Sequence, residues 1–216
     1  MRSGRPPKEL AGEVEERILD AARKVFLDRG FEGASIEKIA EAARSGKPTI
    51  YARFPNKQAL FAGAFMGSII TRSTQSESDA PHGTTIEERL VSIGVALLQM
   101  ALTSEIVGLT RLAIAEAHRF PDLGSGIINM ARERGAETTA RLLGEIAESG
   151  ELGILRAFDP DRLATTAQYF LDFVLLPMLM RALSGENLET LHAEIGPHIS
   201  QRVAFFLAAC RNGGIT

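Results

Sequence analysis

Four polar side chains between residues 47 and 53 are of the types that hydrogen-bond phosphates and base edges in a DNA groove: Lys47, Thr49, Tyr51 and Arg53. Pro48 suits the first turn of a helix, because the N–H that proline lacks would have no partner there. The segment ends near Phe54-Pro55. It therefore predicts a short recognition helix that contacts DNA.

A second short helix and a turn precede this segment and would hold it in place. Ser35 can cap that helix through its hydroxyl, and apolar residues follow at helical spacing, at Ile36, Ile39, Ala40 and Ala43. A third helix begins near Asn56, where free backbone N–H groups and Lys57 could both meet a phosphate. Together these segments predict a helix-turn-helix with a supporting helix.

This stretch resembles the DNA-binding segment of the TetR/AcrR repressors over residues 13 to 65. The matching positions are residues 30–36, 39–40, 47–51, 54–57 and 60–61. The resemblance implies that phosphates are bound by Ser35, Thr49, Tyr51 and Lys57. It also implies that Lys47 hydrogen-bonds bases and that Pro48 contacts a thymine methyl group, so that both affect sequence choice.

The turn between the two short helices departs from the family pattern. The family has Gly-Val-Ser where this chain has Arg44-Ser45-Gly46. A left-handed conformation at an arginine costs about 1–2 kcal/mol, so either Arg44 tolerates the strain or Gly46 takes the unusual backbone angle. We include Arg44 among the candidate DNA-binding residues.

The N-terminal part of the chain is basic although the whole chain has a net charge of −3. Residues 1–57 hold 12 Lys and Arg against 9 Asp and Glu, whereas the remainder holds 12 against 18. Arg5 belongs to a basic arm, residues 1–8, that would enter a minor groove; the alternative is a frayed terminus. A first helix is predicted from Lys8 to Arg29, with Gly30 as its stop signal.

Residues after 56 predict a larger helical domain. A loop at 74–85 is followed by helices at about 85–102, 105–119, 122–149, 160–183 and 187–210. The fold class is all-α, with about nine helices in an N-terminal helix-turn-helix domain, residues 1–55, and a helical effector-binding and dimerisation domain, residues 56–216.

The second domain resembles that of the AefR-like subgroup of the same family. The resemblance implies that the last two long helices pair with their copies across a two-fold axis. The predicted interface residues are Phe170, Val174, Met178, Val203 and Phe206. The alternative is that these residues form a core buried within one chain.

A cavity between the supporting helix and the four helices that follow it would bind a small apolar or amphipathic effector. The candidate lining residues are Phe65, Met66, Ile69, Leu97, Met100, Leu112, Ile128 and Phe173, with Glu116 to meet a polar or cationic group. The alternatives are plain packing for the apolar residues and a salt bridge to Arg119 or Arg111 for Glu116.

Other chemistries find little support. The four histidines and the single cysteine, Cys210, lack metal-ligand spacing, and no nucleophile elbow or phosphate loop is present. We therefore expect no metal, no cofactor and no catalysis. No signal peptide or membrane span is evident, so we expect a cytoplasmic protein.

The sequence predicts a ligand-responsive, homodimeric transcriptional repressor that binds a palindromic operator in double-stranded DNA. The alternative is a helical small-molecule-binding protein that has lost specific DNA binding, for which the altered turn is the only support. A helical enzyme would need a convergent acid/base pair that the sequence does not offer.

Overall fold

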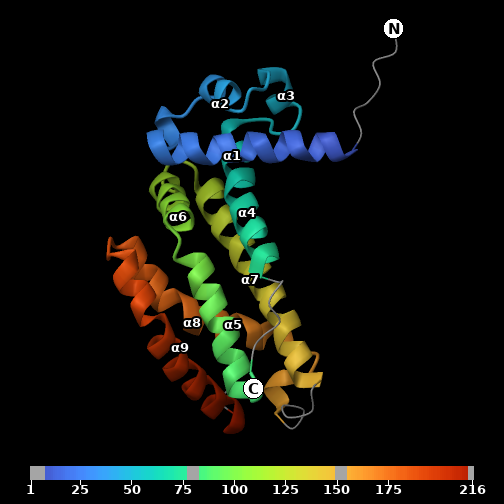
Figure 1. Ribbon diagram of the computed structural model, residues 1–216, viewed down its shortest axis with the longest axis vertical. Coiled ribbons are helices and arrows are strands. Elements are labelled where there is room, and N and C mark those ends of the chain that lie inside the picture. Colours follow the sequence, from blue (N-terminus) through green and yellow to red (C-terminus); the bar gives the residue numbers. More distant parts are fainter. Residues whose placement is uncertain (1–7, 77–82, 149–154, 214–216) are drawn as a thin grey trace. The chain divides into compact units, whose positions relative to one another are not determined.

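The computed structural model describes residues 8–76, 83–148 and 155–213, and these form nine α-helices, one short 3-10 helix and no strand (Figure 1). The predicted all-α fold is confirmed. The chain divides into two compact units, Met1–Thr71 with Gly108–Ile128, and Arg72–Val107 with Asn129–Thr216. The first unit therefore has other bounds than the predicted domain 1–55. Arg5 lies outside the described residues.

The first unit begins with α1 (Lys8–Gly33), on one side of which lie the short helices α2 (Ile36–Ala42) and α3 (Lys47–Tyr51) (Figure 1). The helix α4 (Lys57–Ser76) follows, and the side-chain oxygen of Asn56 accepts the N–H of Ala59 at 2.7 Å at its start. Gly30 interrupts α1 with φ 69° and ψ 175°, a left-handed φ that glycine adopts at little cost. The predicted stop signal therefore marks a kink.

Aromatic rings form the centre of the first unit. Phe26, Phe31 and Phe61 are each buried, and their ring centroids lie 4.9–5.8 Å apart. Phe120, just before α7, adds a fourth ring 5.6 Å from Phe31. Beside it, Arg119 forms an ion pair with Glu32 at 2.5 Å. Arg119 and Phe120 thus hold the end of α1 through an ion pair and a ring contact, which we call the clasp. Almost ninety positions separate the clasp residues from their partners Glu32 and Phe31 in the sequence.

The remaining helices are α5 (Ile86–Ala101), α6 (Ser104–Glu116), α7 (Pro121–Glu148), α8 (Leu163–Leu183) and α9 (Leu188–Arg211), with a 3-10 helix at Arg156–Phe158. Thr85 starts α5 with a capping box, in which its hydroxyl accepts the N–H of Glu88 and the Glu88 carboxylate accepts the N–H of Thr85. The predicted helices end within a few residues of these bounds.

The core of the second unit lies among α5, α8 and α9, which run side by side (Figure 1). It contains all five residues that we predicted for the dimer interface: Phe170, Val174, Met178, Val203 and Phe206. Each is at most 3% exposed. The structure contradicts this assignment, because a side chain that its own chain covers has no surface left for a second copy. The alternative of an intrachain core describes these residues.

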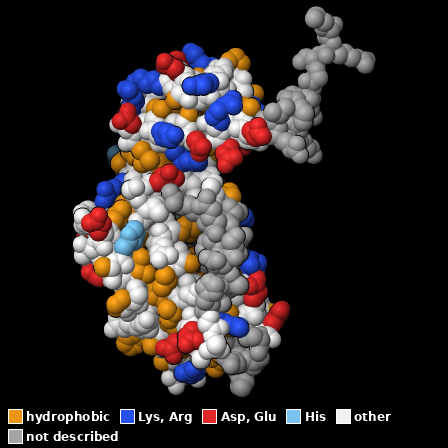
Figure 2. Space-filling model, viewed as in Figure 1, with side chains coloured by type: hydrophobic (Ala, Val, Ile, Leu, Met, Phe, Trp, Pro, Cys, Tyr) orange, Lys and Arg blue, Asp and Glu red, His pale blue; other side chains and the backbone are white. Residues whose placement is uncertain are grey.

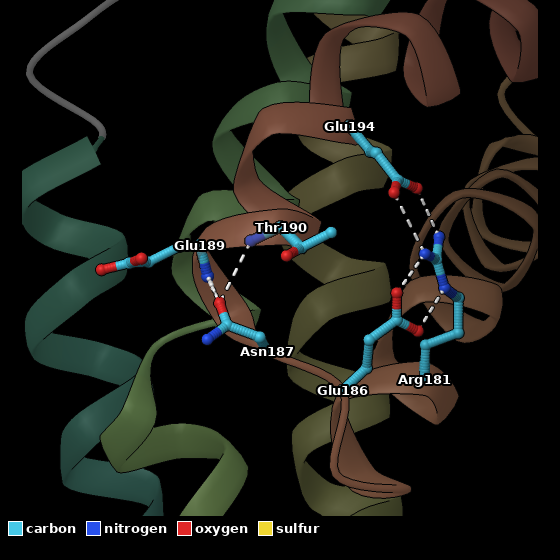
Figure 3. Close-up of polar contacts among 6 residues, drawn as sticks. All are labelled: Arg181, Glu186, Asn187, Glu189, Thr190 and Glu194. Atoms are coloured by element: carbon cyan, nitrogen blue, oxygen red, sulfur yellow. Dashed lines mark hydrogen bonds and ion pairs between the residues drawn. The ribbon is translucent and has the colours of Figure 1, made fainter.

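The connection between α8 and α9 is held by polar contacts (Figure 3). The Arg181 guanidinium donates to Glu186 at 2.8 Å and to Glu194 at 2.6 Å, and these hydrogen bonds hold the pKa of both carboxyls below the ordinary value. The side-chain oxygen of Asn187 accepts the N–H groups of Glu189 at 2.7 Å and Thr190 at 3.2 Å. The turn therefore fixes the start of α9.

The helix α8 is long and apolar enough to cross a membrane by length and composition, as is the bent pair α5 and α6 if it is counted as one span. One or two such helices are weak evidence for a membrane span, since the buried core helix of a globular protein can have the same length and composition. The buried side chains of α8 pack in the core of the second unit.

Candidate nucleic-acid interface

The recognition helix α3 is anchored by one side chain and exposes the others. Ile50 is fully buried, whereas Lys47 and Pro48 are exposed, Thr49 is half-buried and Tyr51 is 50% exposed. The predicted cap at Ser35 is confirmed, since its Oγ accepts the N–H of Lys38 at 3.3 Å. The two short helices thus present a polar face, and the apolar stripe of α2 is buried beneath it.

The turn between α2 and α3 keeps the hydrogen bonds of a helix-ending motif that normally contains glycine. The N–H of Ser45 donates to the Ala40 carbonyl at 2.9 Å, and that of Arg44 donates to Glu41 at 3.0 Å, which is the Schellman pattern. Arg44 occupies its left-handed position, with φ 47°, whereas Gly46 has an ordinary φ of −75°. Of the two alternatives that we left open, Arg44 therefore takes the strain.

Lys47 forms an ion pair that the sequence analysis missed. Its Nζ lies 2.6 Å from Oε1 of Glu37, a residue in the first turn of α2. This hydrogen bond is the main reason that the pKa of Glu37 falls to about 2 and that the pKa of Lys47 rises. The ten-residue separation gave no periodic signal, because the contact depends on how the turn folds.

Two further predicted DNA-binding cations make contacts inside the first unit. The Lys57 ammonium donates to the carbonyls of Phe31 at 2.9 Å and Ala34 at 3.2 Å, and it lies 4.5 Å from the centre of the Phe31 ring. The two hydrogen bonds use two of its three N–H groups. The Arg53 guanidinium donates to the Thr49 carbonyl at 3.1 Å. Lys57 is the first residue of α4, and Arg53 lies two residues after the end of α3.

Figure 2 shows Lys and Arg side chains gathered over the helices of the first unit, with Asp and Glu side chains among them. An open groove of about 470 Å³ also lies between α1 and α2. It is lined by Lys24, Val25, Asp28, Arg29, Lys38, Glu41 and Ala42, and none of the predicted effector-binding residues lines it. In the described residues no three His, Cys, Asp or Glu side chains come together as a metal site.

The predicted effector-binding residues are divided between the two units. Phe65 and Leu97 are buried, and intermediate exposure is found at Met66, Ile69, Met100, Leu112, Glu116 and Ile128. Phe173 is 38% exposed on α8, and the Arg202 guanidinium lies 4.9 Å from its ring centre. The assignment of Phe173 and the other residues to one apolar effector cavity stays a prediction.

Glu116 differs from the other candidates because it carries an unsatisfied carboxylate oxygen. Its Oε2 is buried and accepts no hydrogen bond from any part of the chain that the structure describes. The Arg119 Nη1 lies 4.0 Å away, at the limit of an ion pair. The predicted salt bridge to Arg119 is therefore present only as a long contact, and Arg119 is closer to Glu32.

Comparison with known proteins agrees with this geometry. Residues 18–64 match the model of the bacterial regulatory proteins of the TetR family, and residues 88–212 match the C-terminal domain of AefR-like transcriptional repressors. Since the second match covers more than half of the chain, the protein belongs to the TetR family of transcriptional regulators and has an AefR-like C-terminal domain. The family resemblance seen in the sequence is confirmed.

Several relatives extend over most of the chain. The HTH-type transcriptional repressor Rv1474c of Mycobacterium tuberculosis is 28% identical, over 82% of this chain and 86% of its own length. The flavonoid-responsive regulator FrrA is 30% identical, with a TM-score of 0.62, over 92% of this chain and 97% of FrrA. A TetR transcriptional regulator from Agrobacterium tumefaciens, 22% identical with a TM-score of 0.67 over 90% and 93% of the two chains, shares the fold.

Proposed function

We propose that this regulator is a homodimeric, effector-responsive repressor, in which two copies of α3 enter successive major grooves of a palindromic operator. The observation that carries the proposal is the exposed polar face of α3 above a buried Ile50, reached through a turn with its hydrogen bonds intact. The hydrogen bonds retained in this turn count against the rival proposal, a helical small-molecule-binding protein that has lost specific DNA binding. The operator-binding residues are those predicted from the sequence, and the location is the cytoplasm.

A stripe of exposed apolar side chains supports the homodimer. On α8 it consists of Tyr169, Phe173, Leu176 and Met180, which recur at helical spacing on one side, and Phe205 of α9 is also exposed. Exposed apolar surface of this kind marks protein interfaces in water-soluble proteins. These five residues replace the five buried ones as the proposed contacts between copies.

An effector with a hydrogen-bond donor suits Oε2 of Glu116, because a buried carboxylate oxygen that accepts no hydrogen bond is costly, and the contact with Arg119 is long, at 4.0 Å. Glu116 ends α6, and the clasp of Arg119 and Phe120 onto α1 follows within four residues. A donor bound at Glu116 would therefore act on α1, the helix against which α2 packs. Such an effector changes operator binding only if its affinity differs between the conformation that binds DNA and the one that does not.

Operator binding is tested by selecting duplexes from a random library with the purified protein and comparing Tyr51→Ala with the unaltered chain. Tyr51 is half exposed, so its loss leaves the fold intact, as circular dichroism will show. We expect operator affinity to fall about tenfold, since one phosphate or base contact is lost. An unchanged affinity across a salt series would remove Tyr51 from the interface, and failure to enrich any duplex would sink the proposal.

The dimer is tested with Leu176→Glu, which puts a charge in the middle of the proposed contact. Leu176 is exposed, so the folded monomer tolerates the change. We expect sedimentation velocity to show a dimer for the unaltered chain and a monomer for the variant. Glu189→Gln, on the exposed first turn of α9, is the control. A variant that remains dimeric at the same concentration contradicts the assigned surface.

A further inference from the structure

The ion pair between Glu37 and Lys47 places opposite charges on the proposed DNA-binding face. The side chain of Glu37 is 61% exposed and that of Lys47 is 50% exposed, and Oε1 of Glu37 lies 2.6 Å from Nζ of Lys47. Lys47 is the first residue of α3, and in helix-turn-helix proteins the first residues of the recognition helix are those that contact base edges. Whatever base Lys47 meets, the Glu37 carboxylate is therefore beside it.

A carboxylate in this position cannot bind a phosphate, because the two anions repel. It stays ionised, since Lys47 and its own backbone N–H hold the pKa of Glu37 near 2. In the major groove the donors available to it are the exocyclic amino groups of cytosine and adenine, and a carboxylate characteristically accepts from cytosine N4. Lysine characteristically donates to guanine O6 and N7.

These two preferences are met by a single base pair. A G·C pair presents the guanine O6 acceptor next to the cytosine N4 donor at its major-groove edge. An ammonium and a carboxylate in direct contact offer the complementary pattern, a donor next to an acceptor. An A·T pair with its purine on the same strand presents the reverse, with a donor at adenine N6 against Lys47 and an acceptor at thymine O4 against Glu37. In the T·A orientation the thymine methyl group takes the place of the guanine N7 acceptor beside Lys47.

We propose that Glu37 and Lys47 act together as the reader of one G·C pair in each half-site, with Glu37 as a specificity-determining residue. The inference rests on the proposed operator binding and adds to it a base preference. A competing account makes the pair a strut between α2 and α3 with no part in readout. The two accounts differ in whether the loss of Glu37 affects all sequences equally or one base pair alone.

The experiment uses the full chain and the duplexes enriched from the random library. We expect a G·C pair at one fixed position of each half-site, and exchange of that pair for A·T should lower the affinity of the unaltered protein about tenfold. In Glu37→Gln and in Lys47→Met this discrimination should fall below about threefold, while penalties at the other positions stay the same. Glu41→Gln, which removes an equal charge one turn later in α2, should keep it.

Each result decides the matter. If Glu37→Gln changes the affinity for all duplexes by one common factor and keeps the tenfold preference, the pair is a strut and the inference is wrong. If Glu41→Gln relaxes the preference equally, general charge rather than contact is responsible, which also overturns it. If the unaltered protein enriches no duplex, the proposed function itself fails, so the two failures are distinguishable.

Discussion

The two units expose opposite kinds of side chain on the helices that carry their proposed contacts. In the first unit, α3 buries one isoleucine and exposes lysine, proline and tyrosine. In the second, α8 buries one apolar set and exposes another, of which Tyr169, Leu176 and Met180 are members. The buried and exposed residues of α3 therefore differ in type, whereas in α8 both sets are apolar. In α8 only the direction in which a side chain points determines whether it is buried.

The largest expected effect comes from a test of buried against exposed apolar residues with two adjacent phenylalanines of α9. Phe206 is 3% exposed and its ring packs against Phe170 at 5.0 Å, whereas Phe205 is 58% exposed. We expect Phe206→Ala to lower the free energy of unfolding by about 3–5 kcal/mol, because it leaves a cavity in the core. Urea unfolding, followed at one fixed protein concentration, measures the change.

Phe205→Ala is the matched control. It removes the same atoms one residue earlier, and we expect a cost of under about 1 kcal/mol in the folding of the chain itself. Its effect should instead appear in the sedimentation experiment as weaker association. Equal unfolding costs for the two variants would show that the inside and outside of α9 have been assigned wrongly.

The turn at Arg44 gives a smaller effect of opposite sign. Arg44→Gly removes the left-handed strain at φ 47° but gives the unfolded chain more freedom, so the two terms partly cancel. We expect a net gain of up to about 1 kcal/mol in thermal or urea unfolding. Gly46→Ala is the companion variant, since Gly46 has an ordinary φ and its replacement relieves no left-handed strain. A destabilised Arg44→Gly variant contradicts strain at that residue.

The smallest effect concerns acid. The folded pKa of Glu37 lies near 2, below the ordinary value of 4.5, so its contribution to stability is present above pH 4.5 and is lost as the pH falls towards 2. Lys47→Met should return the pKa of Glu37 towards the ordinary value. NMR titration of the Glu37 carboxyl in both proteins measures this, and an unshifted pKa in the unaltered chain would contradict the ion pair.

Local signals allowed the helices and the first unit to be predicted from sequence. Ser35, Pro48 and Gly30 act through their own backbone neighbourhood, and each is found at a helix cap, a first turn or a break. The spacing of apolar residues gave the helix bounds for the same reason. Family membership rests on the same short stretch and is confirmed by both domain matches.

The second unit shows what spacing alone could not decide. Phe170, Val174 and Met178 repeat at helical spacing, and so do Tyr169, Phe173, Leu176 and Met180 on the adjoining side. Both sets are apolar, so the choice of which one faces α5 and α9 depends on long-range packing. The pairing of Glu37 with Lys47 was missed for a related reason, because it depends on the path of a turn.

The clasp of Arg119 and Phe120 onto the end of α1 limits how this regulator can be recombined with others. A chimaera cut at residue 55, or even at Thr71, would separate Phe31 from the ring of Phe120 and Glu32 from its arginine. A graft that keeps the first unit intact includes Gly108–Ile128 in addition to Met1–Thr71. In this chain the exchangeable module is therefore discontinuous, and because its second stretch contains Glu116, exchanging the rest of the chain leaves that proposed effector contact unchanged.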